Sequence, residues 1–262
     1  MPKINKAKTI CITSSKGGVG KTVVTLNLAA IYHLLGKKVL IMDLDLYGGG
    51  IGLSLNIDID KTIYNIVDDM MNNRFKNITD YINKYNENID VICSPKDPRQ
   101  AIKIDSKYID LLLYNLESKY DVILIDTNHI LDSINLTIMD RSYNNLFIVT
   151  NDPIDLKNTK SIISIFNNND ITNYRILYNN SRDTGRDYFS MFDIKNIIKA
   201  NIDYTITKNF YIKDIDNYTL DGKILLLDKH IQRTKKKDFK NFKNMAINLI
   251  EDKKKKKVTS ND

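Results

Sequence analysis

The residues best suited to chemistry form one glycine-rich segment, residues 14–22 (Ser-Ser-Lys-Gly-Gly-Val-Gly-Lys-Thr). An apolar run at 9–13 precedes this segment, and residues 24–35 carry apolar side chains at helical spacing. A strand, a glycine loop and a helix in this order can bind phosphate, because glycine lets backbone N–H groups curl around an anion that also faces the helix N-terminus. Lys21 adds a positive charge for the β- and γ-phosphates, and Thr22 offers a hydroxyl to Mg²⁺. A plain turn is the alternative, and the flanking strand and helix disfavour it.

The elements around this loop alternate between strands and helices. Further strands are predicted at 37–42, 90–93, 120–126, 145–150 and 174–178. Helices are predicted between them, at 61–71, 78–85, 109–116 and 153–166. This alternation predicts an α/β fold with a doubly wound, mostly parallel sheet and helices on both faces. We expect one domain over residues 1–251, since no change of composition divides the chain.

Carboxylates stand at the ends of two predicted strands. Asp43 and Asp45 end the second strand, and their side chains point the same way because side chains alternate along a strand. One of them could orient an attacking water, while the other contacts a mobile loop or the metal shell. Asp126 ends a buried apolar strand, and the glycine-rich residues 46–53 would form a mobile segment. Because strand ends face the ligand crevice of a parallel sheet, we favour a functional site over ordinary solvated turns.

The run from Lys16 to Thr22, Lys-Gly-Gly-Val-Gly-Lys-Thr, resembles the deviant Walker A loop of the MinD/ParA family of ATPases. The resemblance implies a P-loop NTPase fold of the SIMIBI type, ATP and Mg²⁺ as cofactors, and an ATP-dependent homodimer. It implies that Lys16 reaches the partner's phosphates, that Asp45 positions the hydrolytic water, and that Asp126 holds Mg²⁺ through water. The resemblance also implies two sets of binding residues. The nucleotide would be bound by Lys16, Gly17, Gly18, Val19, Gly20, Lys21, Thr22, Val23 and Asn179. Mg²⁺ would be bound by Thr22, Asp43 and Asp126.

Two positions leave alternatives open. In the resembled family an asparagine at the end of the sixth strand contacts adenine, which indicates Asn179, although a turn asparagine fits as well. The family usually has Pro or Ala where this chain has Asn128, so the loop after Asp126 departs from the pattern. His129 could be a polar contact of that loop, but we expect an exposed loop histidine, since no carboxylate or cysteine lies near it in sequence.

Segments beyond the loop resemble the CpaE/TadZ branch, whose members localise pilus assembly. The similar segments are 44–48, 91–98 and 134–140. This resemblance implies a slow, partner-stimulated ATPase that positions a pilus or secretion machine through a protein partner. The alternatives are a MinD/ParA-like division-site or DNA-partition ATPase, and a nucleotide-binding scaffold with little hydrolysis.

The positive charge is concentrated near the C-terminus. The chain has 262 residues and a net charge of +7, and residues 229–257 hold twelve basic and three acidic side chains. Residues 235–251 form a predicted amphipathic helix, followed by a lysine-rich tail at 252–262 that we expect to be disordered. The helix could dock on the domain, contact an anionic membrane surface, or bind DNA, and we favour docking and consider DNA the weaker partner. Two cysteines and the absence of a signal-like apolar segment predict a cytoplasmic protein, with peripheral contact at the inner membrane face as an option.

Overall fold

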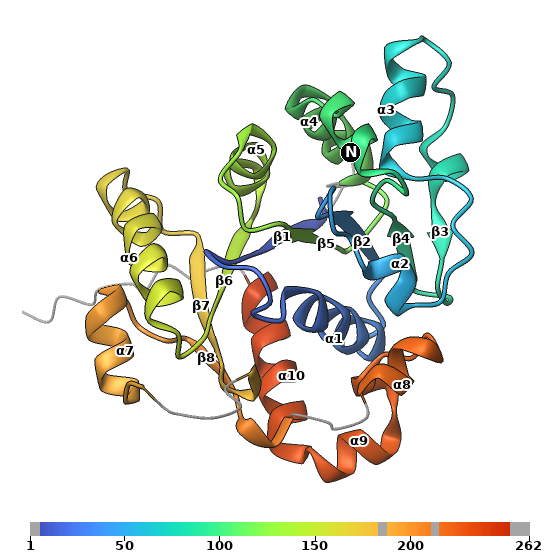
Figure 1. Cartoon of the computed structure of the whole chain (residues 1–262). Coiled ribbons are helices and arrows are strands. Elements are labelled where there is room, and N and C mark those ends of the chain that lie inside the picture. The colour runs from blue at the N-terminus through green and yellow to red at the C-terminus, as the bar shows by residue number, and fades with distance from the viewer. Residues whose placement is uncertain (1–5, 183–187, 211–214, 252–262) are drawn as a thin grey trace, which may run out of the picture.

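Eight strands form one sheet in the computed structural model, which describes residues 6–182, 188–210 and 215–251 (Figure 1). The strand order is β3-β4-β2-β5-β1-β6-β7-β8, and only the β3–β4 pair is antiparallel. The strands are β1 (Lys8–Thr13), β2 (Val39–Leu44), β3 (Asn83–Lys84), β4 (Ile89–Ile92), β5 (Val122–Thr127), β6 (Asn144–Val149), β7 (Tyr174–Asn179) and β8 (Tyr204–Ile206).

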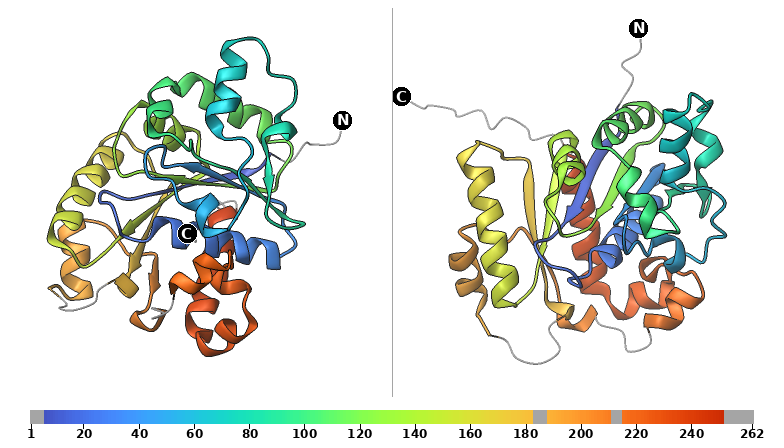
Figure 2. Two further views of the ribbon diagram at one scale, coloured as in Figure 1. Left: turned by 45° about the vertical axis from the view of Figure 1, so that its right-hand side comes forward. Right: turned by 45° about the horizontal axis from the view of Figure 1, so that its top comes forward.

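Helices cover both faces of this sheet, as the two further views show (Figure 2). The apolar side chains of each face form a separate buried cluster, so the sheet is the middle layer of three. One cluster includes residues from α3 (Ile63–Met71), α4 (Ser106–Leu116), α5 (Ser133–Arg141), α6 (Pro153–Asn168) and α7 (Met191–Ile198). The other includes residues from α1 (Lys21–Leu34), α2 (Ile51–Ser54), α8 (Ile215–Leu220), α9 (Lys229–Thr234) and α10 (Lys236–Ile250).

The predicted doubly wound, mostly parallel fold is confirmed. The central strands β2, β5 and β6 are buried along their whole length, as apolar runs between two helical layers should be. The helix predicted at 78–85 is wrong. Residues Ile78–Tyr81 form a single 3₁₀ turn, and β3 then pairs with β4. Pairing with an existing sheet edge supplies backbone hydrogen bonds that a short isolated helix would not, so tertiary context overrides the local pattern.

The C-terminal helix α10 packs against the domain through its apolar face. Phe242, Met245 and Leu249 are buried, and the Tyr32 hydroxyl of α1 donates a 2.8 Å hydrogen bond to the Ala246 carbonyl. A membrane-bound helix would need this same face, so the structure does not offer it to a lipid surface. The tail at 252–262 lies outside the described residues. Among the described helices, none has the length and apolarity that a membrane span requires.

The order of the strands fixes where a ligand would lie. The chain leaves β1 through α1 toward β2 on one side, and later returns from β5 to β6 on the other side of β1. Ligands of open α/β sheets bind outside the carboxyl ends of the strands at such a reversal. The glycine loop, which follows β1, lies at this position (Figure 1).

Candidate functional site

The loop after β1 has the backbone shape of an anion cradle. Gly18 and Gly20 have φ angles of 77° and 99°, a region that residues with a Cβ avoid, and Gly20 is the N-cap of α1. The Lys21 side chain is buried, and its Nζ lies 3.1 Å from the Ser14 hydroxyl. Burial lowers the pKa of Lys21, which the nearby carboxylate of Asp126 partly opposes. A positive group held in a concave backbone suits a phosphate.

Beside the loop, Asp126 and Thr22 form a pair with spare binding capacity. The Thr22 hydroxyl donates a 2.7 Å hydrogen bond to Asp126 Oδ2. The other oxygen, Oδ1, is buried and has no hydrogen-bond partner among the described residues. Burial raises the pKa of Asp126 to about 6. An unpartnered buried carboxylate oxygen next to a hydroxyl is a fitting donor set for Mg²⁺, a hard cation that prefers oxygen ligands.

Asp43 lies opposite Asp126 in the sheet, and its carboxylate is hydrogen-bonded to the segment that follows β2. The two residues face each other in the β2–β5 register. Asp43 Oδ2 accepts hydrogen bonds from the Ile51 amide (3.1 Å) and from the Ser94 hydroxyl (3.2 Å). Burial, and then the nearby Asp126 carboxylate, raise the pKa of Asp43 to about 8. These contacts anchor the glycine-rich segment after β2, and the role of Asp43 as a Mg²⁺ ligand stays a prediction.

Asp45 stands where that glycine-rich segment begins. Its side chain is partly exposed, and its Oδ1 accepts a long hydrogen bond of 3.3 Å from the Gly48 amide. The segment passes close to the strand ends, because a Cβ on Gly49 would lie only 1.9 Å from the Ser94 hydroxyl oxygen. The structure therefore brings Asp45 to the same edge of the sheet as Asp126 and the glycine loop.

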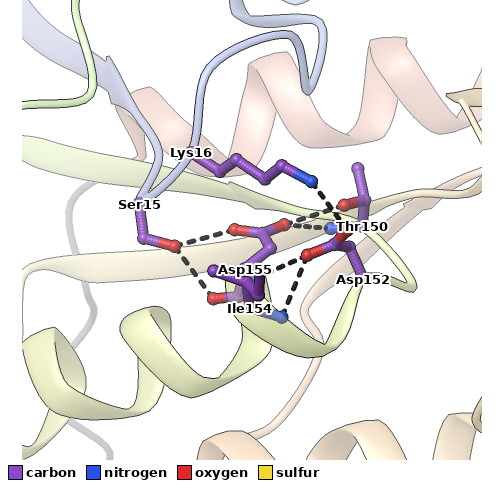
Figure 3. Close-up of polar contacts among 6 residues, drawn as sticks. All are labelled: Ser15, Lys16, Thr150, Asp152, Ile154 and Asp155. Atoms are coloured by element: carbon purple, nitrogen blue, oxygen red, sulfur yellow. Dashed lines mark hydrogen bonds and ion pairs between the residues drawn. The ribbon is translucent and has the colours of Figure 1, made fainter.

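Lys16 is held by a carboxylate that sequence reasoning missed (Figure 3). Its Nζ forms a 2.6 Å ion pair with Asp152 Oδ2, and this hydrogen bond raises the pKa of Lys16. The other oxygen of Asp152 caps α6 by accepting from the amides of Ile154 and Asp155. The sequence Asn151-Asp152-Pro153 predicts the start of a helix. Nothing in it indicates that Asp152 pairs with a lysine 136 positions away.

Asp155, which the sequence analysis also did not identify, connects the same loop to α6 by hydrogen bonds. The Ser15 hydroxyl donates to Asp155 Oδ1 at 2.8 Å, and the Thr150 amide and hydroxyl both donate to Oδ2 (Figure 3). Asp155 is fully buried, and burial raises its pKa. Both residues at the start of the loop, Ser15 and Lys16, are thus positioned by the first turn of α6.

The loop after Asp126 is fixed by a pair of asparagines. Asn128 Oδ1 accepts hydrogen bonds from the Ile130 amide (2.8 Å) and from Asn135 Nδ2 (2.7 Å). Asn135 lies on α5 and is buried. The departure from the family pattern at Asn128 therefore has a structural role, since its side chain closes the turn that carries His129. His129 is exposed, as predicted.

Asn179 contacts the glycine loop directly. Its Nδ2 donates a 2.8 Å hydrogen bond to the Val19 carbonyl, and its Oδ1 accepts from the Ser181 amide and hydroxyl. The side chain is buried. Asn179 therefore joins the end of β7 to the loop, and its contact with adenine stays a prediction.

Known proteins share this fold and part of this sequence. Residues 7–177 match the family described as AAA domain. A putative septum site-determining protein MinD from Oltmannsiellopsis viridis is 26% identical over 176 residues, which cover 67% of this chain and 55% of that protein. The chain thus spans about half the length of the curated relatives that it matches.

Two solved structures match nearly the whole chain. A ParA family ATPase from Chlorobium tepidum TLS has a TM-score of 0.77 at 19% identity, covering 93% of this chain and 98% of that one. The septum site-determining protein MinD from Pyrococcus horikoshii OT3, solved with Mg-ADP, has a TM-score of 0.73 at 22% identity, covering 93% and 96%. At these identities the structures show the common fold. The family match over residues 7–177 shows that this chain belongs to the AAA domain family.

Proposed function

We propose that this chain binds ATP with Mg²⁺, dimerises in the ATP-bound state and hydrolyses ATP slowly as a timer. The observation that carries the proposal is the unpartnered, buried Oδ1 of Asp126 beside the Thr22 hydroxyl, at the mouth of a loop with a buried lysine. A bound Mg²⁺ would neutralise phosphate charge there, held by Thr22 and Asp126. Lys21 and the loop amides would bind the phosphates.

Asp45 supports hydrolysis in this proposal. It lies at the same edge of the sheet, at the start of the glycine-rich segment that Asp43 anchors. Its carboxylate can accept a hydrogen bond from a water and orient it toward the terminal phosphate, which is the positioning task that phosphoryl transfer demands. Asp43 holds this segment through the Ile51 amide and the Ser94 hydroxyl.

Lys16 supports the dimer. In the single chain its ammonium is partly exposed, with 42% of the side chain accessible, and it is paired with Asp152. Lys16 lies at the exposed rim of the loop, whereas Lys21 is buried. At the rim, a phosphate group or a second chain can compete with Asp152 for the Lys16 ammonium. We propose that ATP binding draws Lys16 from Asp152 to the phosphates of the partner, as the family resemblance implies.

The biological role that we propose is that of a MinD/ParA-like switch that positions a division site or a partitioned DNA. The relatives named above support this alternative better than the pilus-assembly role that we predicted first. A protein partner would recognise the ATP-bound dimer and stimulate hydrolysis, since ATP contributes contacts to both chains only in the dimer.

The test uses isothermal titration with nucleotide, with and without Mg²⁺, and phosphate release. We expect Asp126→Asn and Thr22→Ala to lose the Mg²⁺-dependent part of ATP affinity, and Thr22→Ser to retain it. Asp121→Asn is the matched control, because Asp121 immediately precedes β5, at the end opposite Asp126, and its carboxylate accepts a hydrogen bond from the Lys38 amide. A nucleotide affinity that is the same with and without Mg²⁺, and that neither Asp126→Asn nor Thr22→Ala changes, would refute the proposal.

Hydrolysis is tested separately through Asp45→Ala. We expect phosphate release by the wild type and none above background in the variant, while ATP binding persists. Wild-type protein that binds Mg-ATP but releases no phosphate would instead identify a nucleotide-binding scaffold.

A further inference from the structure

The loop after β5 places a histidine against the phosphate-binding loop. If Gly17 carried a Cβ, that atom would lie 3.7 Å from both Cε1 and Nδ1 of His129, which is van der Waals contact. His129 is otherwise exposed, so one side of its ring faces Gly17 and another remains open to solvent or ligand. An imidazole ring therefore lies at the surface of the loop that we propose to bind phosphate.

The position of this ring is built into the fold. Hydrogen bonds to the Asn128 side chain hold the backbone around His129. Asn128 Oδ1 accepts from the Ile130 amide and from Asn135 Nδ2. Asn135 Nδ2 also donates to the Ile130 carbonyl at 2.6 Å, and the Thr127 hydroxyl donates to the Ile12 carbonyl of β1. A turn held by four hydrogen bonds keeps its central side chain near one place.

The layout of the sheet indicates which end of a nucleotide this ring meets. Asn179 contacts the loop at Val19 from β7, on the side of β1 where β6 and β7 lie (Figure 1). Asp126 and Thr22 flank the loop from the other side, where β5 adjoins β1. With the metal toward Asp126, the β- and γ-phosphates that Mg²⁺ bridges would lie toward β5, the strand whose loop carries His129.

We propose that His129 donates a hydrogen bond to the terminal phosphate of ATP and makes the site prefer ATP over ADP. The inference rests on the proposed ATP binding and adds a residue that sequence reasoning left as a surface histidine. A neutral imidazole always carries one N–H, so the donor exists in either protonation state. In the proposed site Lys21 would bind these phosphates from the glycine loop, whereas His129 would reach them from the segment after β5.

The experiment measures the affinities of the full chain for Mg-AMPPNP and Mg-ADP by isothermal titration. The variants are His129→Ala, which removes the ring, His129→Phe, which keeps the packing without a donor, and His129→Gln, which restores a donor. We expect His129→Ala and His129→Phe to weaken AMPPNP binding about tenfold or more, the effect of one lost bond to a charged group. ADP binding should change less than about twofold, and His129→Gln should recover part of the AMPPNP affinity. His230→Ala, an exposed histidine on α9, is the control.

The outcomes separate this inference from the proposed function. Equal losses for AMPPNP and ADP in His129→Ala would show that the ring only packs on Gly17, and would overturn the inference while leaving nucleotide binding intact. An unchanged AMPPNP affinity in both His129→Ala and His129→Phe would overturn it too. Wild-type protein that binds neither nucleotide would refute the proposed function together with the inference.

Discussion

Replacing Asp152 by asparagine should strengthen the ATP-dependent dimer. Asp152 Oδ1 caps α6 and Oδ2 holds Lys16, so Asp152→Asn keeps the capping oxygen and replaces the Lys16 acceptor by an amide donor. Lys16 then no longer has to leave an ion pair before it can bind the partner's phosphates. Part-exposed ion pairs contribute about 0.5–1 kcal/mol each. A dimer breaks two such pairs, which amounts to about 1–2 kcal/mol and an about 5- to 30-fold lower dimer dissociation constant.

The assay is sedimentation equilibrium over a range of protein concentrations with Mg-AMPPNP, and with Mg-ADP for comparison. Asp105→Asn is the matched control, since Asp105 caps α4 through the Lys107 amide and is not a contact of Lys16. We expect Asp105→Asn to leave the dissociation constant unchanged, and Lys16→Ala to abolish the dimer even when combined with Asp152→Asn. A dimer that Asp152→Asn weakens would refute the reasoning, because it would mean that Asp152 contributes to the interface itself.

Three further predictions concern stability without nucleotide. Gly49→Ala would place a Cβ 1.9 Å from the Ser94 hydroxyl oxygen, and should lower the free energy of unfolding in urea by about 1–3 kcal/mol, whereas Gly50→Ala has open space and should change it little. Phe242→Ala, at a fully buried position of α10, should cost about 3–5 kcal/mol in the same assay, and a change within about 0.5 kcal/mol would mean that α10 does not pack on the domain in solution. The pKa of Asp43 is raised to about 8 in the fold, so its ionisation opposes folding, and stability should fall as the pH rises from about 4 to about 8. Asp43→Asn should flatten that decline between pH 6 and pH 8, and an unaltered slope in urea titrations would contradict the assignment.

The fold and the centre of the site could be predicted because their signals are local. The glycine loop can be recognised from nine consecutive residues between a predicted strand and a predicted helix. Asp126 can be recognised from its place at the end of an apolar run. Strands that alternate with helices leave few topologies, and every carboxyl-end loop then meets at one edge of the sheet. The meeting of Asp126 with Thr22 follows from that rule, although the two residues are 104 positions apart.

The contacts that adjust the site could not be predicted, because no local spacing records them. Lys16 pairs with Asp152, 136 positions away, and Ser15 with Asp155, 140 positions away. In the sequence these two aspartates look like ordinary residues of a helix start. His129 is exposed, as predicted, but its closeness to Gly17 could not be predicted because the two residues lie far apart in the sequence.

The sequence by itself determined that this chain has a phosphate loop on a parallel α/β sheet, since short-range backbone chemistry dictates both. Only the tertiary structure decided what the apolar face of α10 packs against, what Asp43 holds and which carboxylate pairs with Lys16. These depend on which of several chemically similar partners the folded chain brings within about 3 Å, the range over which hydrogen bonds act.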